Sequence, residues 1–164
     1  MQFQRQVSNV LHDEHQANLA LLGRVERSFM RAPRAGAVRD AELARLAGNF
    51  ARHIEQDIGR HFDFEERELF PRLVESGAGD LAGLLAEEHV AIRAVAGEIL
   101  PLARSAAAET LDDAGWDALK RGALEMVERL VSHIDKETAA LLPALDNLLD
   151  EDIDRELAFA YVSG

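Results

Sequence analysis

The feature that most constrains the fold is an internal repeat of two short patterns, each of which occurs once in either half of the chain. The pattern Leu-x-Asp/Glu-Glu-His occurs at residues 11–15 and again at 85–89. The pattern His-Phe/Ile-Asp-x-Glu-x-x-x-Leu-Phe/Leu-Pro occurs at 61–71 and again at 133–143. The repeat predicts two helical hairpins of similar design that pack face to face with approximate two-fold symmetry.

Four long stretches carry apolar residues at the three- and four-residue spacing of an amphipathic helix. They cover about residues 3–30, 40–74, 80–104 and 112–149, and a tail at 151–162 is expected to form a short helix on the bundle end. Pro33 and Gly36 break the chain after the first stretch, and Asp80 is the expected N-cap of the third. Three further prolines should kink or end their helices: Pro71, Pro101 and Pro143. Long helices with short connections predict an all-α, up-down-up-down four-helix bundle with a short C-terminal helix.

Composition fits a single helical domain over residues 1–164, since 48% of the residues are hydrophobic and only 5% are aromatic. The net charge of −12 argues against nucleic-acid binding, which depends on Lys and Arg. The chain has no cysteine, which excludes disulfides, thiolate-held iron–sulfur clusters and cysteine nucleophiles. The polar N-terminus and the lack of a long uncharged apolar run predict no signal peptide and no membrane segment. We therefore expect a cytoplasmic protein.

The second pattern places a histidine and a glutamate four residues apart, as His61 with Glu65 and His133 with Glu137. This spacing puts an imidazole and a carboxylate on one face of a helix, one turn apart. The first pattern adds one further histidine on each preceding helix, His15 and His89. Imidazole with carboxylate suits iron, manganese or zinc, and six donors exceed what one tetrahedral zinc needs. They suit two metal ions, each with two histidines, that share both glutamates.

With these residues in place, the sequence resembles the hemerythrin-like family, also called the HHE cation-binding domain, over about Val10 to Leu145. The family motif H…HxxxE…H…HxxxE is matched by His15, His61, Glu65, His89, His133 and Glu137. The resemblance implies a non-haem di-iron centre, in which zinc or manganese can substitute for iron. It implies that His15 and His61 bind one iron, that His89 and His133 bind the other, and that the two glutamates bridge them.

Two positions depart from the members of that family that carry O2. Those proteins have a second histidine one turn after the histidine of the third helix, where this chain has Arg93. Their fourth helix supplies an aspartate five residues after its histidine, where this chain has Glu137 four residues after. The missing imidazole predicts a more open pair of iron positions than a reversible O2 carrier has. The chain also has no cysteine-bearing region like that of the iron–sulfur repair proteins of the family.

Several polar residues near the motif have two interpretations. His12 is either a partly exposed helix residue or a spare or supporting group. His53 and Asp57 precede His61 at four-residue spacing and either line a channel toward the site or belong to a solvated stripe. Glu14 and Glu88 either accept hydrogen bonds from the ligands or, as we favour, belong to an exposed acidic face. Arg93 either faces the pocket and binds an anion or, as we favour, extends to solvent. The remaining neighbours are expected to pack or to lie on the surface: Phe62, Asp63, Phe64, Phe70, Trp116, Asp135 and Tyr161.

Three functions remain open at this point. The first is a module that binds or senses O2, NO or iron through an open di-iron site, and the second is a di-iron redox enzyme that consumes peroxide or oxidises Fe(II). The third is an interaction bundle without a functional metal. We favour the first, because the sequence shows no acid or base near the site beyond the ligands themselves. The expected partner is a small exogenous ligand such as O2, NO or peroxide, and the sequence identifies no protein partner.

Overall fold

A computed structural model describes residues 3–31 and 40–164, and for Asp57 it describes the backbone alone. The first long helix is α1 (Gln6–Arg31) and the third is α5 (Gly79–Ala107). The second consists of α2 (Ala41–Arg52), η1 (His53–Ile58), α3 (Gly59–Phe64), η2 (Glu65–Leu69) and α4 (Phe70–Glu75). The fourth consists of α6 (Asp113–Lys136), η3 (Glu137–Leu141) and α7 (Leu142–Leu148), and α8 (Glu151–Ser163) follows. The expected break at Pro33 and Gly36 lies outside the described residues.

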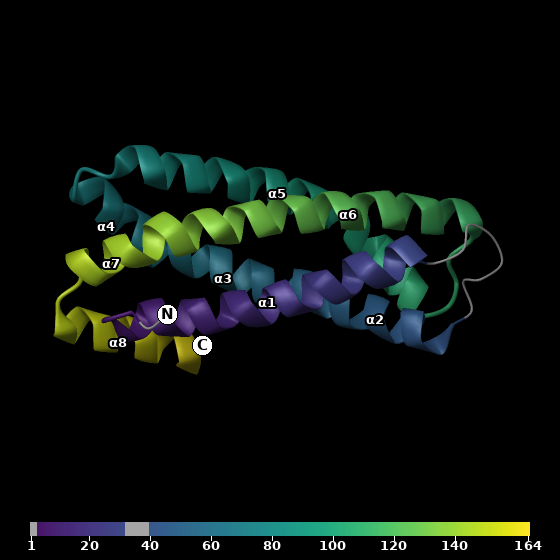
Figure 1. Ribbon diagram of the computed structural model, residues 1–164, viewed down its shortest axis with the longest axis horizontal. Helices are drawn as coiled ribbons and strands as arrows, with labels where there is room; N and C mark the ends of the chain where they lie inside the picture. Colours follow the sequence, from purple (N-terminus) through teal and green to yellow (C-terminus); the bar gives the residue numbers. More distant parts are fainter. Residues whose placement is uncertain (1–2, 32–39) are drawn as a thin grey trace.

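Each long helix packs against the next one in the chain, and the fourth packs against the first, so the four form a closed ring. α1 contacts α2 and α6, and α5 contacts the same two helices from the other side. Figure 1 shows the four running antiparallel along the long axis, with α8 beside the N-terminal half of α1. The predicted up-down-up-down bundle with a short C-terminal helix is confirmed. None of the described helices has both the length and the apolar character that crossing a membrane requires.

Aspartates cap the N-termini of three helices, and a glycine follows the end of a fourth. Asp40, Asp112 and Asp150 each accept a hydrogen bond from a backbone N–H in the first turn of the helix that follows. The second helix ends at Glu75, and Gly77 in the turn that follows has a φ of 93°, which is accessible because glycine has no side chain. The expectation for Asp80 is wrong, because α5 begins at Gly79 and Asp80 already lies in its first turn.

Two of the three π-helical segments follow directly from the repeat. The segments η2 and η3 begin at Glu65 and Glu137, and each is followed by a proline in the first turn of the next helix. A proline offers no N–H, and its ring clashes with the carbonyl four residues earlier. The helical turn widens instead. The backbone N–H groups of Phe70 and Leu142 donate to the main-chain carbonyls of Glu65 and Glu137, five residues back. By contrast, α5 continues through Pro101 to Ala107 and does not end there.

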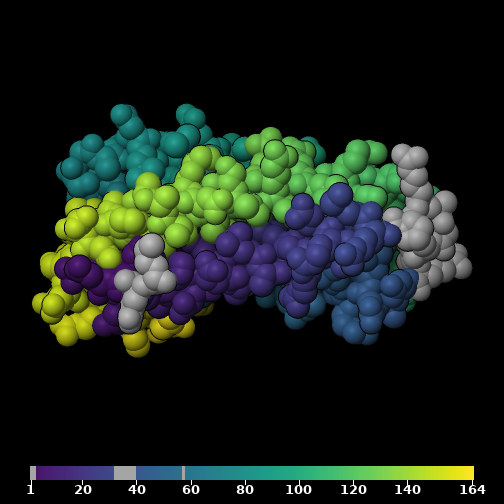
Figure 2. Space-filling model, viewed as in Figure 1, coloured from purple at the N-terminus to yellow at the C-terminus, as the bar shows by residue number. Residues whose placement is uncertain are grey.

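The core is divided into two apolar clusters with a polar layer between them. One cluster surrounds Phe29, Phe50 and Trp116 at the end of the bundle where α2 begins. The other surrounds Leu69, Leu85 and Leu141 and includes the buried face of α8. On each long helix, the buried apolar residues change from one cluster to the other near the histidine of the repeat. Figure 2 shows α1 (purple) packed against α6 and α7 (green to yellow), with α8 (yellow) along the edge. The polar layer therefore lies deep inside the bundle, away from both ends.

Candidate metal centre

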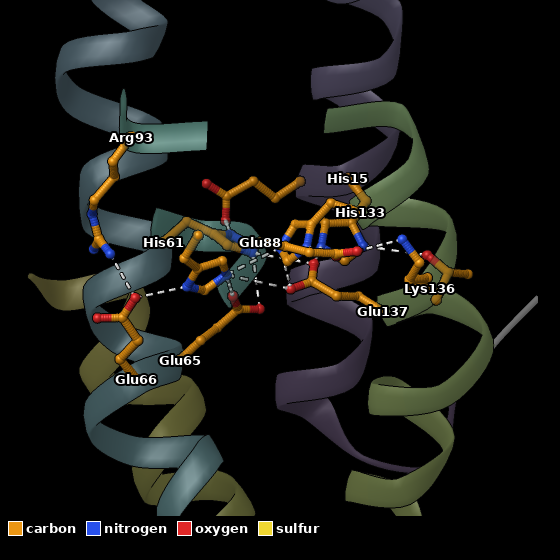
Figure 3. Close-up of polar contacts among 12 residues, drawn as sticks. His15, His61, Glu65, Glu66, Glu88, Arg93, His133, Lys136 and Glu137 are labelled. Atoms are coloured by element: carbon orange, nitrogen blue, oxygen red, sulfur yellow. Dashed lines mark hydrogen bonds and ion pairs between the residues drawn. The ribbon is translucent and has the colours of Figure 1, made fainter. Parts of the chain in front are cut away.

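All six residues of the sequence motif meet in this polar layer. His15 comes from α1, His61 from α3, His89 from α5 and His133 from α6, while the two glutamates open the π-helical segments η2 and η3. Each of the six is at most 5% exposed. Figure 3 shows His15, His61, Glu65, His133 and Glu137 converging from different helices toward the middle of the bundle. The structure thus brings together the residues that the repeat predicts.

One group of donors consists of His15, His61, Glu65 and Glu137. The Nε2 atom of His15 lies 3.0 Å from Oε2 of Glu137. The Nε2 atom of His61 lies 3.0 Å from Oε1 of Glu65 and 3.9 Å from Oε2 of Glu137. One ligand atom from each of these four residues lies within 4.8 Å of the other three. This spacing is compact enough for one cation to contact all four.

The second group consists of His89, His133 and the same two glutamates. The Nε2 atom of His89 lies 3.2 Å from Oε2 of Glu65, and that of His133 lies 2.8 Å from Oε1 of Glu137. The two Nε2 atoms lie 3.0 Å from each other. Each glutamate therefore turns one oxygen toward the first pair of histidines and the other oxygen toward the second pair. This is the arrangement expected of carboxylates that bridge two cations.

The hydrogen-bond geometry indicates what the layer is built to hold. All four carboxylate oxygens of Glu65 and Glu137 are buried without a hydrogen-bond partner, although histidine nitrogens lie close to them. The Nε2 atom of His15 is likewise unpaired. Histidine nitrogens lie as close as 2.8 Å to these carboxylate oxygens without the geometry of a hydrogen bond, so both are directed at a shared point. Buried carboxylates without hydrogen bonds are costly unless a cation offsets their charge. The six donors therefore fit two metal cations that share both glutamates.

On the His89 side, two carboxylates hold the outer nitrogens of the histidines. The Nδ1 atom of His89 lies 2.8 Å from Oε1 of Glu66, which also accepts a hydrogen bond from Arg93. The Nδ1 atom of His133 lies 2.8 Å from Oε2 of Glu88, which also pairs with Lys136 (Figure 3). A carboxylate on Nδ1 directs Nε2 inward with its lone pair free and makes the imidazole a stronger ligand.

On the His15 side, hydroxyl groups occupy the same places. The Nδ1 atom of His15 lies 3.3 Å from Oγ1 of Thr138. The Nδ1 atom of His61 lies 3.1 Å from the hydroxyl of Tyr161, and Oε2 of Glu14 is 3.4 Å away. The Tyr161 hydroxyl in turn donates a hydrogen bond to Glu14. All four histidines are therefore held through Nδ1, but by different chemistry in the two halves.

The electrostatics of the metal-free site favour charged side chains. Burial lowers the pKa of His61, His89 and His133, but Glu65 and Glu137 outweigh it, so the pKa of each histidine is raised, for His89 to about 9. Burial raises the pKa of Glu137, but its contacts with the four histidines hold that pKa well below its usual range. Without metal, protons on His61, His89 and His133 therefore offset the buried charge of Glu137.

Aromatic side chains wall the His89 half. The ring of Phe62 stacks on His89 at 3.6 Å with an interplanar angle of 7°, and Phe70 lies 5.3 Å from the same imidazole. The guanidinium of Arg93 also lies over the ring of Phe62, 5.4 Å from its centroid. The expected apolar packing beside the site is confirmed. The wall also keeps His89 fully buried.

Comparison with known proteins agrees with this geometry. The family model of the hemerythrin HHE cation-binding domain matches residues 6–145, which is most of the chain and contains all six donors. The chain belongs to this family. A comparison with curated proteins found no match. Membership in the HHE family indicates a domain that binds metal cations, and the buried histidine and glutamate cluster can hold one.

Within this HHE domain, several neighbours differ from their expected roles. Glu14 and Glu88 are not simply an exposed acidic face, because each contacts a histidine of the site. Arg93 does not extend freely to solvent, since it pairs with Glu66 and Asp63. Tyr161 is more than a packing residue. Glu66 and Thr138 carried no signal in the sequence, because neither recurs at the matching position of the other half.

The two remaining histidines stay outside both donor groups. His12 is half-buried and packs against Phe3, with the ring centroids 5.5 Å apart. His53 is 4% exposed at the start of η1, so the alternative of a solvated stripe is wrong for it, while the side chain of Asp57 lies outside the described part of the chain. Among the described residues, the two groups that share Glu65 and Glu137 are the ones whose spacing suits a cation. The HHE domain therefore uses four of its six histidines at the centre.

The raised pKa of His89 predicts opposite pH responses for metal-free stability and metal affinity. Folding raises this pKa from 6.5 to about 9, so the protonated histidine stabilises the metal-free fold fully below pH 6.5. That contribution, on the order of 3 kcal/mol at most, is lost as the pH rises toward 9. Metal affinity should instead increase over the same range, because a cation must displace these protons.

Urea unfolding of the metal-free HHE domain and metal titration, both between pH 6.5 and 9, would measure the two responses. A metal-free protein that is equally stable or more stable at pH 9 would contradict the assignment of the protons to these histidines. The His89→Gln variant is a suitable control, because it keeps a polar group at this position but cannot gain a proton there. Its metal-free stability should change less over this range.

Proposed function

We propose that the chain binds two iron ions, one between His15 and His61 and the other between His89 and His133, with Glu65 and Glu137 bridging them. The observation that carries the proposal is that both glutamates face both histidine pairs while all four of their oxygens lack hydrogen bonds. A single cation would leave one histidine pair and half of the carboxylate oxygens unused. Two cations account for every donor in the layer.

The donor set favours iron over zinc. Two histidines with carboxylate oxygens are typical of non-haem iron sites, which keep positions open for an exogenous ligand. A structural zinc site is instead closed by four protein ligands. The third helix offers Arg93 where an additional histidine would occupy one of these positions, and Arg93 is engaged with Glu66 and Asp63. We propose that the open positions take a small ligand such as O2 or NO, and that the chain is a single cytoplasmic domain.

The surroundings of the site favour binding or sensing over catalysis. Each of the three carboxylates next to the ligands is already in contact with a histidine and with a cationic side chain. A carboxylate fixed in this way holds a ligand in place and is poorly placed to exchange protons with a substrate. These three residues are Glu14, Glu66 and Glu88. We therefore rank a ligand-binding or sensing role above peroxide consumption or Fe(II) oxidation.

Reconstitution with Fe(II) under anaerobic conditions, followed by metal analysis and absorption spectroscopy, tests the proposal. We expect two irons per chain and a spectral change when O2 or NO is added. The His61→Ala variant should lose one iron. Asp135→Asn is the control, because Asp135 belongs to the second copy of the same pattern but is exposed. One zinc per chain or no metal would overturn the di-iron site. Two irons without any response to O2 or NO would overturn the ligand-binding role.

Peroxide turnover separates the enzymatic alternative from the favoured one. If the fully loaded protein consumes peroxide or oxidises added Fe(II) over many cycles, and the His61→Ala variant does not, the chain is a redox enzyme. A binding or sensing module is expected to respond once and stoichiometrically. The same preparation serves both assays, so the metal content is identical in the comparison.

A further inference from the structure

The last helix supplies a side chain to the metal centre although it lies outside the region that the family match covers. The match ends at residue 145, and α8 begins at Glu151. Tyr161, in the final turns of α8, is the only tyrosine in the chain and is 4% exposed. Its hydroxyl lies 3.1 Å from Nδ1 of His61. The connection between α8 and the centre therefore involves a part of the chain that the family match does not cover.

The hydrogen bonds around Tyr161 have a single consistent direction. The Nε2 atom of His61 faces the glutamates, so a cation there leaves the proton on Nδ1, which donates to the Tyr161 oxygen. The Tyr161 hydroxyl then donates to Oε2 of Glu14 on α1. Arg60 completes the cluster by donating to the main-chain carbonyl of Tyr161, and its guanidinium lies 4.7 Å from the tyrosine ring.

The N-terminal half of α8 is held by hydrogen bonds to the start of α1. Asp154 accepts hydrogen bonds from the N–H groups of Gln6 and Val7, which open α1, and Leu157 is buried in the apolar cluster. Beyond Tyr161 the helix has exposed residues, including Val162 at 63%. The last turns of α8 are thus held at Tyr161, through its ring 4.6 Å from that of Phe64, through its hydroxyl and through the Arg60 hydrogen bond to its carbonyl.

We propose that Tyr161 is a positioning residue for His61, and that docking of the end of α8 is linked to occupation of the half-site formed by His15, His61, Glu65 and Glu137. The proposal rests on the proposed function, since it requires a metal there. A partner on Nδ1 orients the imidazole and strengthens it as a ligand. Linkage is reciprocal, so if docked α8 raises metal affinity, bound metal must favour docked α8 by the same factor.

Two matched variants separate this role from a loss of hydrogen bonding in general. Tyr161→Phe removes the hydroxyl but keeps the ring against Phe64, and Thr138→Val removes the hydroxyl that contacts Nδ1 of His15 without involving α8. In anaerobic Fe(II) titrations we expect each variant to weaken binding at this half-site about tenfold. We expect the other half-site to keep its affinity. Circular dichroism of the metal-free variants controls for folding.

Hydrogen exchange of the α8 amides provides the readout that a merely structural role would not change. In the unmodified protein, Fe(II) should slow exchange in the last turns of α8 by about the same tenfold factor that Tyr161→Phe removes from the affinity. Thr138→Val should keep this metal-dependent slowing, and Tyr161→Phe should lose it. Exchange of the α6 amides near Trp116, far from α8, serves as the internal reference in all three proteins.

The outcomes distinguish this inference from the function on which it rests. If the unmodified protein binds no metal, the proposed function itself fails. If it binds two irons but Tyr161→Phe binds them with unchanged affinity, the positioning role is overturned and the di-iron proposal stands. If Fe(II) leaves α8 exchange unchanged in the unmodified protein, the linkage to α8 is overturned. The proposal is supported if both variants lose affinity at this half-site and only Tyr161→Phe also loses the metal-dependent protection of α8.

Discussion

Replacing Glu137 with glutamine should remove both metal ions, although it changes a single side chain. One oxygen of Glu137 lies 3.0 Å from His15 and the other lies 2.8 Å from His133, so the residue belongs to both donor groups. The amide keeps the shape of the carboxylate but loses its charge and one of its two acceptor oxygens. We expect the affinity for Fe(II) at both positions to fall by more than about 100-fold, because loss of a direct ligand exceeds the loss of a supporting residue.

Metal analysis after anaerobic reconstitution measures this effect, with Asp135→Asn as the control. Asp135 lies two residues away on the same helix but is exposed, so its variant should retain two irons. The metal-free Glu137→Gln variant should remain folded, because the histidines can lose protons when the carboxylate that raises their pKa is gone. A Glu137→Gln variant that still holds one tightly bound iron would contradict the shared role of the carboxylate.

The repeat made the centre predictable because ligand geometry in a helical bundle is local. A histidine and a glutamate four residues apart must share a helix face, so His61 with Glu65 and His133 with Glu137 define two facing pairs before any tertiary contact is known. The prolines of the same pattern carry information that a regular-helix interpretation overlooks. Each forces a π-helical segment that begins at Glu65 or Glu137.

The groups that hold the ligands were harder to predict, because they depend on how separate helices pack. Glu66 reaches His89 on another helix, and Tyr161 reaches His61 across 100 residues of sequence. Neither contact follows from a spacing along one helix. Some partners do follow the repeat, because Glu14 and Glu88 hold the same place in the two copies of the first pattern and contact Nδ1 of His61 and His133. The others do not, since Glu66 corresponds to Thr138 and Tyr161 lies beyond the repeat. Approximate symmetry therefore extends to the six donors and only to some of the side chains that support them.

Removing the metal should lower the melting temperature by about 10 °C or more. A ligand that binds only the folded state at about 1,000 times its dissociation constant stabilises that state by about 4 kcal/mol per site. In a chain of this size, each kcal/mol shifts the midpoint by about 2–4 °C. Unfolding separates donors that come from four different helices, so the unfolded chain has no comparable site.

Calorimetry of the iron-loaded protein, before and after treatment with a chelator under reducing conditions, measures this shift at a fixed pH. The metal-free form remains a folded bundle, because two large apolar clusters flank the polar layer and do not depend on the cation. The Glu137→Gln variant should melt at the same temperature with and without chelator, which separates a specific effect from chelator binding elsewhere. If protein that contains two irons by analysis melts at the same temperature after they are removed, the irons are not held between the helices, and the buried donors must be balanced by protons alone.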